Sequence, residues 1–314
     1  MKTFNTTSKK LFGGLCAALL GLCSISVAHA QIFVTNYSSN AIGEYNLDGT
    51  TINASLVSGL DGPEGLALSG NDLYVANLGN GTIGEYNATT GAAINASLVS
   101  GLHEPLAVEI SGNDLFVSNY ANNTIGEYDA TTGAAINASL VSGLNNPQDL
   151  ALSGNDLYVV NANSGTIGEY DATTGAAINA SLVSGLHSLI AIDLSGNDLF
   201  EASEFGNTIG EYNATTGAAI NASLVSGLSN NTIDIALSGN DLYVVSSTDN
   251  TIGEYDATTG AAINASLVSG LNNPEFLAVK EVPEPSTWAM LLGGLALLAF
   301  WRKRMRRALV RLSL

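Results

Sequence analysis

Six acidic residues fall in the segments of this sequence that vary most, and their carboxylates could bind a cation or a polar ligand. They are Glu64, Glu104, Asp149, Glu204, Asp234 and Glu275. Carboxylate and amide carbonyl oxygens are the ligands that hard cations such as Ca²⁺ take in proteins. One interpretation is therefore a divalent-cation site, with calcium as the ion. The other is ordinary polar loop chemistry, and the sequence alone leaves both open.

The sequence offers little support for catalysis by histidine, serine, threonine or cysteine side chains. His103 and His187 are the histidines beyond position 30, and they lie far apart in the sequence. Serine and threonine are abundant, but no base stands beside them to activate a hydroxyl. The two cysteines, Cys16 and Cys23, precede the expected start of the mature chain, which leaves it without thiols or disulfides. The sequence therefore predicts a protein that is not an enzyme.

An internal repeat of about 42 residues must position these side chains. The tetrapeptide Ile-Gly-Glu-Tyr occurs six times, at steps of 41 to 43 residues. Its glutamates are Glu44, Glu85, Glu127, Glu169, Glu211 and Glu254. Fixed periods of this length are typical of propellers and solenoids. A charge repeated at one position of every repeat favours a structural role for these glutamates.

Each repeat has the pattern of four short strands. In the second repeat they are residues 65–69, 72–77, 82–87 and 92–100, separated by turns rich in Gly, Asn and Thr. Short β-branched and aromatic runs with this punctuation are typical of strands. The second run is almost continuously apolar, as expected when both faces of a sheet are covered.

The strand count predicts how the ring closes. Six strands of the first type and six of the second type occur, but the chain opens on a second-type strand near Ile32 and ends on a first-type strand near Phe276. Residues 276–280 should therefore pair with residues 32–36. We predict an all-β fold, a six-bladed β-propeller of four-stranded blades over residues 31–280, closed by pairing of the N- and C-terminal strands. The alternative, an open β-solenoid, would need polar caps that the sequence lacks.

The repeat resembles the NHL and YVTN propeller repeats. The resemblance rests on the patterns at residues 63–67, 70–77 and 81–87, and it extends over residues 31–280. It implies the propeller fold and leaves the function open, because propellers host unrelated activities.

The N-terminal 30 residues have the pattern of a secretory signal peptide. A basic start is followed by an apolar run over residues 11–27 and by Ala28-His29-Ala30, a small-x-small cleavage site. The mature chain should then begin at Gln31. The alternative is an N-terminal membrane anchor.

Residues 281–314 resemble a PEP-CTERM sorting tail. The motif Pro283-Glu284-Pro285 precedes a short apolar segment at residues 288–301 and a basic end. We expect residues 288–301 to be a short transmembrane segment that anchors the chain in the inner membrane, at least transiently. The basic end begins with Arg302, Lys303 and Arg304, and basic residues tend to stay cytoplasmic. The resemblance implies processing by an exosortase-type enzyme. The alternative is a plain C-terminal transmembrane anchor, although the apolar run is shorter than the ~20 residues that span a bilayer comfortably.

The charge distribution excludes one class of partner. Residues 31–280 contain 26 of the 28 Asp and Glu residues but a single basic residue, Lys280. A surface this acidic repels phosphate backbones, so we expect no nucleic-acid partner.

Variation between the repeats points to one face of the predicted propeller. It gathers in the loop after the second strand and in the link before the first strand, and both should emerge around one mouth of the channel. We therefore expect an exported, non-enzymatic binding or structural protein of the cell envelope or extracellular matrix, which recognises a polysaccharide or a protein through this face. The alternative is a calcium-dependent hydrolase resembling gluconolactonase-type propellers. The chain lacks that family's Glu-Gly-Pro opening and has only Pro63-Glu64-Gly65.

Glu201 departs from its repeat. The other repeats have a small apolar residue at this position of the second strand. A charge in a strand covered on both faces is costly unless it is paired.

Overall fold

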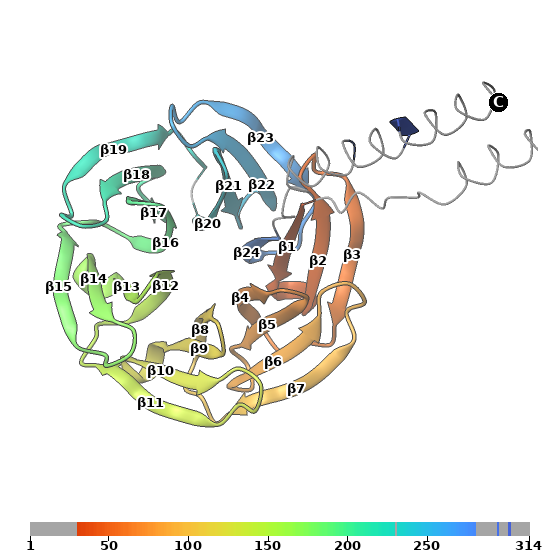
Figure 1. Cartoon of the computed structure of the whole chain (residues 1–314). Coiled ribbons are helices and arrows are strands. Elements are labelled where there is room, and N and C mark those ends of the chain that lie inside the picture. The colour runs from red at the N-terminus through yellow and green to blue at the C-terminus, as the bar shows by residue number, and fades with distance from the viewer. Residues whose placement is uncertain (1–29, 230, 281–293, 295–300, 303–314) are drawn as a thin grey trace, which may run out of the picture. The chain divides into compact units, whose positions relative to one another are not determined.

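Short apolar strands separated by Gly- and Asn-containing turns build six four-stranded antiparallel sheets around a central channel (Figure 1). The computed structural model describes residues 30–229, 231–280, 294 and 301–302. The predicted all-β, six-bladed propeller is confirmed. The predicted signal peptide, except for Ala30, lies outside the described residues.

All blades have the same strand order from the channel to the rim. The innermost strands are β4 (Pro63–Ser69), β8 (Pro105–Ser111), β12 (Pro147–Ser153), β16 (Leu189–Ser195), β20 (Thr232–Ser238) and β24 (Pro274–Lys280). The second strands are β5 (Asp72–Asn77), β9 (Asp114–Asn119), β13 (Asp156–Asn161), β17 (Asp198–Ser203), β21 (Asp241–Ser246) and β1 (Gln31–Asn36).

The third strands carry the Ile-Gly-Glu-Tyr motif. They are β6 (Thr82–Asn87), β10 (Thr124–Asp129), β14 (Thr166–Asp171), β18 (Thr208–Asn213), β22 (Thr251–Asp256) and β2 (Ala41–Asn46). The rim strands are β7 (Ala93–Ser100), β11 (Ala135–Ser142), β15 (Ala177–Ser184), β19 (Ala219–Ser226), β23 (Ala262–Ser269) and β3 (Thr51–Ser58). We number the blades 1 to 5 from β4–β7 to β20–β23, and blade 6 combines β24 with β1–β3.

Three loops between second and third strands contain a single 3-10 turn. These are η2 (Tyr37–Ser39), η3 (Tyr120–Asn122) and η4 (Ala162–Ser164). Each ends on a residue with positive φ, namely Asn40, Asn123 and Gly165. Asn and Gly tolerate this left-handed conformation better than other residues.

The two ends of the propeller meet in blade 6, where β24 pairs with β1. Gln31 lies opposite Lys280, and Ile32 lies opposite Val279. The predicted pairing of residues 276–280 with residues 32–36 is confirmed. The closing sheet contains one strand from the end of the propeller sequence and three from its beginning (Figure 1).

Apolar side chains between neighbouring blades form the core. One cluster combines Tyr74, Ala76 and Ile83 of blade 1 with Leu115 and Val117 of blade 2, and all five side chains are buried. The second strands are therefore covered on both faces, which explains their nearly unbroken apolar sequence. Because each blade buries its faces against its neighbours, no blade has a core of its own.

The repeated Gly-Glu-Tyr motif has a packing reason. A Cβ atom added to Gly84 would lie 2.7 Å from Cε2 of Tyr86, which shows that the tyrosine ring lies directly against this glycine. Glu85, between them, is buried and has a pKa raised first by burial and then by the charge of Asp72. In blade 6 the equivalent Glu44 accepts a hydrogen bond from Nε2 of Gln31 at 2.7 Å. This is consistent with the structural role expected for the repeated glutamates.

The turns between third and rim strands are held by their own side chains. In blade 1, Oδ1 of Asn87 accepts hydrogen bonds from the backbone N–H of Thr89 at 3.1 Å and of Thr90 at 2.9 Å. The hydroxyl of Thr89 donates to Oδ1 of Asn71 in the neighbouring turn at 2.7 Å. Gly91 has a φ of 69°, and a Cβ atom there would collide with the carbonyl oxygen of Leu56 in blade 6. These contacts explain why the Ala-Thr-Thr-Gly turn hardly varies.

Glu201 is buried in β17, on the face of blade 4 that packs against blade 3. Its side chain is 4% exposed, and Oε2 has no hydrogen-bond partner. Burial raises its pKa to about 7. The second strands of the other blades have valine at this position: Val34, Val75, Val117, Val159 and Val244.

Replacing Glu201 by Val should therefore stabilise the propeller. An unsatisfied buried polar group costs about 1–3 kcal/mol, so we expect Glu201→Val to raise the free energy of unfolding by about this amount at neutral pH. Urea denaturation would measure the change. The reciprocal control, Val159→Glu in blade 3, should lower stability, and a Glu201→Val protein no more stable than the parent would contradict the burial argument.

Candidate functional site

The two variable segments of each blade lie side by side on one face of the propeller. In blade 1 the backbone N–H of Leu78, in the loop after β5, donates to the carbonyl of Gly62, in the link before β4, at 2.9 Å. In blade 6 the N–H of Tyr37 donates to the carbonyl of Asn273 at 3.0 Å. We call these paired segments the loop face. The expected gathering of variable loops on one face is thus present.

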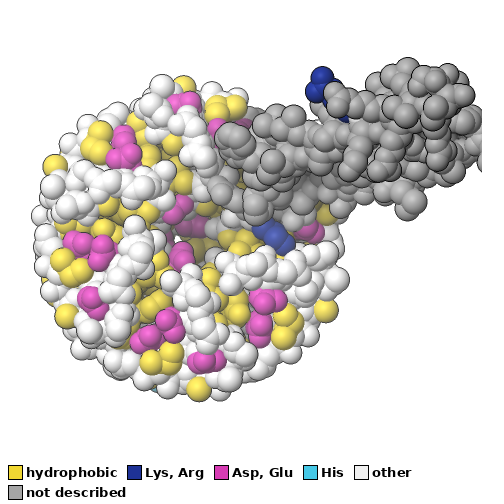
Figure 2. All heavy atoms as spheres, viewed as in Figure 1, with side chains coloured by type: hydrophobic (Ala, Val, Ile, Leu, Met, Phe, Trp, Pro, Cys, Tyr) yellow, Lys and Arg dark blue, Asp and Glu magenta, His cyan; other side chains and the backbone are white. Residues whose placement is uncertain are grey.

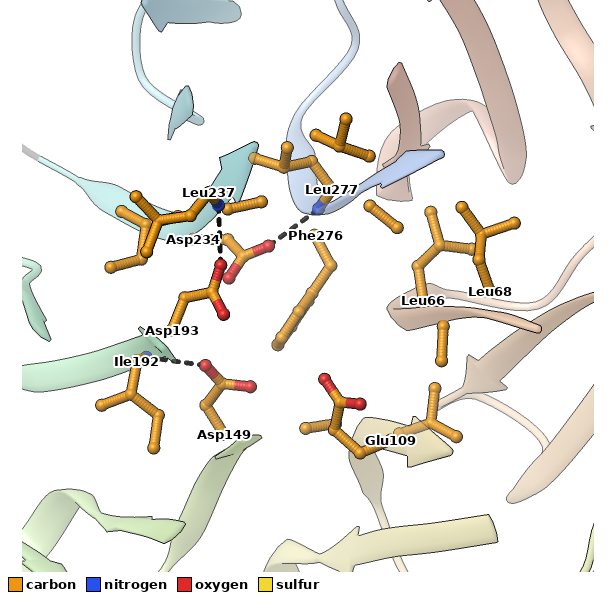
Figure 3. Close-up of a pocket in the computed structure, with 17 residues that line it drawn as sticks. Leu66, Leu68, Glu109, Asp149, Ile192, Asp193, Asp234, Leu237, Phe276 and Leu277 are labelled. Carbon is orange, nitrogen blue, oxygen red and sulfur yellow. Dashed lines mark hydrogen bonds between the residues drawn. The ribbon is translucent and has the colours of Figure 1, made fainter. Parts of the chain in front are cut away.

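The innermost strands enclose a cavity of about 230 Å³ within the channel. Four carboxylates line it, one each from β8, β12, β16 and β20: Glu109, Asp149, Asp193 and Asp234 (Figure 3). The ring of Phe276 from β24 also faces the cavity. We call this the channel cluster, and Figure 2 shows acidic side chains around the central hollow.

Three of these carboxylates connect neighbouring blades. Asp149 accepts hydrogen bonds at 2.8 Å from the N–H of Leu150, the next residue, and from the N–H of Ile192 on the next blade. Asp193 accepts from Leu237 at 2.7 Å in the same way. Asp234 accepts from Leu277 at 2.8 Å. Because backbone ladders run within the blades, these charge-assisted bonds satisfy inner-edge N–H groups that the ladder leaves free.

Burial and mutual repulsion favour the protonated forms of the cluster. The pKa of Glu109 rises to about 8, first through burial and then through the charges of Asp193 and Asp149. Burial also raises the pKa of Asp149 to about 7 and that of Asp193 to about 6, each partly offset by the backbone hydrogen bonds. For Asp234 the pKa lies well above its usual value, chiefly through burial and the charge of Asp149. Near neutral pH the cluster therefore shares protons among its members.

A second acidic group lies at the loop-face ends of β4 and β24 and in the loop after β17. Burial raises the pKa of Glu64 to about 8, with a further contribution from Glu275. The pKa of Glu275 rises to about 7 through burial and the charge of Glu204, although Asn273 donates a hydrogen bond to it at 2.5 Å. We call Glu64, Glu204 and Glu275 the mouth group.

The predicted site residues thus divide into three sets. Asp149 and Asp234 lie in the channel cluster, and Glu64, Glu204 and Glu275 form the mouth group. Glu104 is exposed in the link before β8 and does not line the cavity. The described residues contain no group of three or more His, Cys, Asp or Glu side chains placed to hold a metal ion. The calcium interpretation gains no support from this geometry and stays a prediction.

Sequence reasoning missed Glu109 and Asp193. Both occupy the fifth position of the innermost strand, where the other blades have Ala67, Ala151, Ala236 and Ala278. A position-by-position alignment of the innermost strands would have revealed them, because a carboxylate in place of a small apolar residue stands out.

Comparison with known proteins identifies the tail. Residues 281–307 match the PEP-CTERM protein-sorting motif. The motif implies a bacterial source, and it indicates export and membrane-associated sorting to the cell envelope or surface. Most of this segment, including Pro283, Glu284 and Pro285 and the end of the basic run, lies outside the described residues. Within the described part of the chain no helix has the length and apolarity to cross a membrane.

Solved structures share the fold of the propeller. A chain from the crystal structure of a nidogen/laminin complex superposes with a TM-score of 0.66 at 14% identity, over 80% of this chain and 98% of that chain. A computationally designed protein, Ika8, gives a TM-score of 0.49 at 22% identity, over 80% of this chain and 75% of its own. At such identities the first likeness shows the fold alone. No curated protein matches the sequence.

The channel cluster predicts an unusual pH dependence of stability. A carboxylate whose pKa is higher in the folded state binds more protons when folded, so its contribution is complete below its ordinary pKa and is lost as pH rises through the folded value. For Glu109 that window extends from the ordinary value of 4.5 to about 8. We therefore expect the free energy of unfolding to fall between pH 4.5 and pH 8, as measured by urea denaturation.

Glu109→Gln provides the matched test, because it removes the titration and keeps the shape. The variant should gain at least about 1.4 kcal/mol over the parent at pH 8, the equivalent of one pKa unit, and differ little from it at pH 4.5. A parent protein whose stability rises steadily from pH 4.5 to pH 8 would contradict the raised pKa values.

Proposed function

We propose that this chain is an exported, surface-located and non-enzymatic binding protein that recognises a polysaccharide through the loop face. The observation that carries the proposal is the pairing of the two variable segments of every blade on that one face. In a chain whose repeats are otherwise nearly identical, differences collected on one face are what recognition of an irregular partner requires. The sorting motif supports a location outside the cytoplasm.

The side chains of the loop face suit carbohydrate. Its loops are rich in Asn, Ser and Gly, which donate and accept hydrogen bonds in many geometries. Tyr37 and Phe205 are exposed there, at 38% and 63%, and aromatic rings pack well against the apolar faces of sugars. Recognition of a protein remains the second candidate, since the same residue types serve protein interfaces.

The carboxylates of the channel support a structural role. Asp149, Asp193 and Asp234 are occupied by backbone N–H groups of the next blade, which leaves fewer of their lone pairs for a substrate or an ion. The calcium-dependent hydrolase is therefore the weaker alternative.

Removal of the two exposed aromatic rings should weaken binding. We expect the double variant Tyr37→Ala/Phe205→Ala to lose at least about tenfold in affinity for a retained polysaccharide, equivalent to about 1.4 kcal/mol. Affinity electrophoresis through gels containing neutral polysaccharides would measure this. Ile94→Ala, which removes an exposed apolar residue from the rim strand β7, is the matched control. Failure of the parent chain to bind any polysaccharide would refute the proposal, and selective capture of a protein would favour the second candidate.

A calcium titration separates binding protein from hydrolase. A calcium site with a Kd of about 0.1 mM would stabilise the fold by about 2.7 kcal/mol at 10 mM ion. We expect no such increase in Tm by differential scanning calorimetry, with magnesium as the control for ionic strength. A shift specific to calcium would favour the hydrolase and count against the present proposal.

A further inference from the structure

A second cavity, separate from the channel, lies between the link that joins blades 4 and 5 and the four strands of blade 5. Its volume is about 360 Å³, within the range of about 300–1,000 Å³ typical of small-molecule pockets. Polar groups dominate its lining: Ser229, Thr232, Ser246, Asp249, Thr251 and Tyr255. We call it the blade 5 pocket.

Two departures from the repeat shape this pocket. The first is Ser246 at the end of β21, where four other blades have an asparagine: Asn36, Asn77, Asn119 and Asn161. In blade 3, Oδ1 of Asn161 accepts the N–H of Asn145 in the link at 3.0 Å, so the amide fills the space beneath the link. The shorter Ser246 instead meets the hydroxyl of Ser229 at 3.0 Å. Volume that an amide occupies elsewhere is thereby left open.

The second departure is Thr232 at the start of β20. Four other blades have proline there: Pro63, Pro105, Pro147 and Pro274. The Thr232 side chain is 1% exposed and its hydroxyl has no hydrogen-bond partner. A buried hydroxyl without a partner is unusual in a folded protein. Because the residue lines the pocket, a ligand hydroxyl there would satisfy it.

Tyr255 provides an aromatic wall. The equivalent tyrosines of the other five blades are buried, whereas Tyr255 is half-buried. In blade 3 the pKa of Tyr170 is raised by burial and lowered in part by the side chain of Asn161, and Ser246 makes no such contribution to the pKa of Tyr255. Burial and the nearby charge of Asp249 raise the pKa of Tyr255, so its hydroxyl stays protonated and able to donate. The pocket thus combines one ring, one carboxylate and several hydroxyls.

This chemistry selects a neutral polyhydroxylated ligand. An anion would meet Asp249 and the strongly acidic chain, and a wholly apolar ligand would leave the Thr232 hydroxyl unsatisfied. A metal ion would find one carboxylate, Asp249, among the lining residues. A neutral sugar ring offers hydroxyls for Thr232 and Asp249 and an apolar C–H face for Tyr255. We infer that the blade 5 pocket binds one neutral hexose residue, an inference that rests on the proposed recognition of polysaccharide.

The repeat itself supplies a double variant that fills the pocket with an amide and removes its unsatisfied hydroxyl. Ser246→Asn and Thr232→Pro restore the residues of the other blades. The backbone can accept the proline, because Asn231 has a φ of 73° before Thr232, and Asn146 has a φ of 55° before Pro147. Ser203→Asn makes the same change in blade 4, outside the pocket, and is the matched control.

Binding would be measured by saturation-transfer NMR on the full chain, held in a detergent without a sugar headgroup. The probes are glucose, galactose and mannose, with glucuronate as the charged comparison. We expect at least one neutral hexose to bind the parent and the Ser203→Asn control equally. Ser246→Asn/Thr232→Pro should weaken its binding at least tenfold, and glucuronate should bind more weakly than the neutral sugar. Asp249→Asn should reduce that preference against glucuronate.

The outcomes distinguish this inference from the proposed function. If the filled variant binds hexose as the parent does, or no hexose binds while a polysaccharide is still retained, the pocket inference is wrong and the loop-face proposal stands. If the parent binds neither hexose nor polysaccharide, the pocket inference and the proposed recognition of polysaccharide are both wrong. Loss of hexose binding in the filled variant, with a urea stability no lower than that of the parent, would support the pocket.

Discussion

Burial of apolar side chains between neighbouring blades is the interaction on which the rest of the structure depends. Each four-stranded sheet has two apolar faces, and each face is covered only by the next blade in the ring. A closed ring meets this requirement, because every blade then has a neighbour on both faces. The ring is closed by the backbone hydrogen bonds between β24 and β1. The free energy that apolar burial contributes to folding is therefore complete only when the ring is closed.

The channel carboxylates follow from the same constraint. Blades in a ring pack by their faces, so the inner edge of each blade has no neighbouring strand to pair with. Asp149, Asp193 and Asp234 compensate by accepting N–H groups across the gap between blades. These bonds gather negative charge in the channel, whose lining includes no basic side chain, and burial and mutual repulsion raise the pKa values of the carboxylates. Acidity in the channel thus has a structural explanation before any functional one.

The two faces of the propeller follow different rules. At the turns between third and rim strands, Asn87 and its counterparts use their side chains to complete the hydrogen bonds of the turn, so substitution is costly and the sequence hardly varies. On the loop face, backbone bonds between the paired loops maintain much of the geometry, and asparagine side chains such as Asn40 and Asn161 accept N–H groups of the links. Side chains such as Tyr37 and Phe205 can therefore change without loss of the fold, which is the usual condition for a recognition surface. The blade 5 pocket lies in the same region, where Ser246 replaces the asparagine of four other blades.

The sequence by itself determined the repeat, the strands, the six-bladed count, the closure and the sorting tail, because all of them are periodic or motif-based signals that local residue patterns carry. It also placed the variable loops on one face, since strand alternation decides on which side each loop emerges. Only the tertiary structure separated Asp149 and Asp234 from Glu64, Glu204 and Glu275, left Glu104 exposed, and revealed Glu109 and Asp193. Convergence of side chains from six different strands depends on how far each projects into the channel, and a one-dimensional pattern does not contain that depth. The blade 5 pocket is likewise a volume left by missing atoms, which becomes visible only when the neighbouring blade is in place.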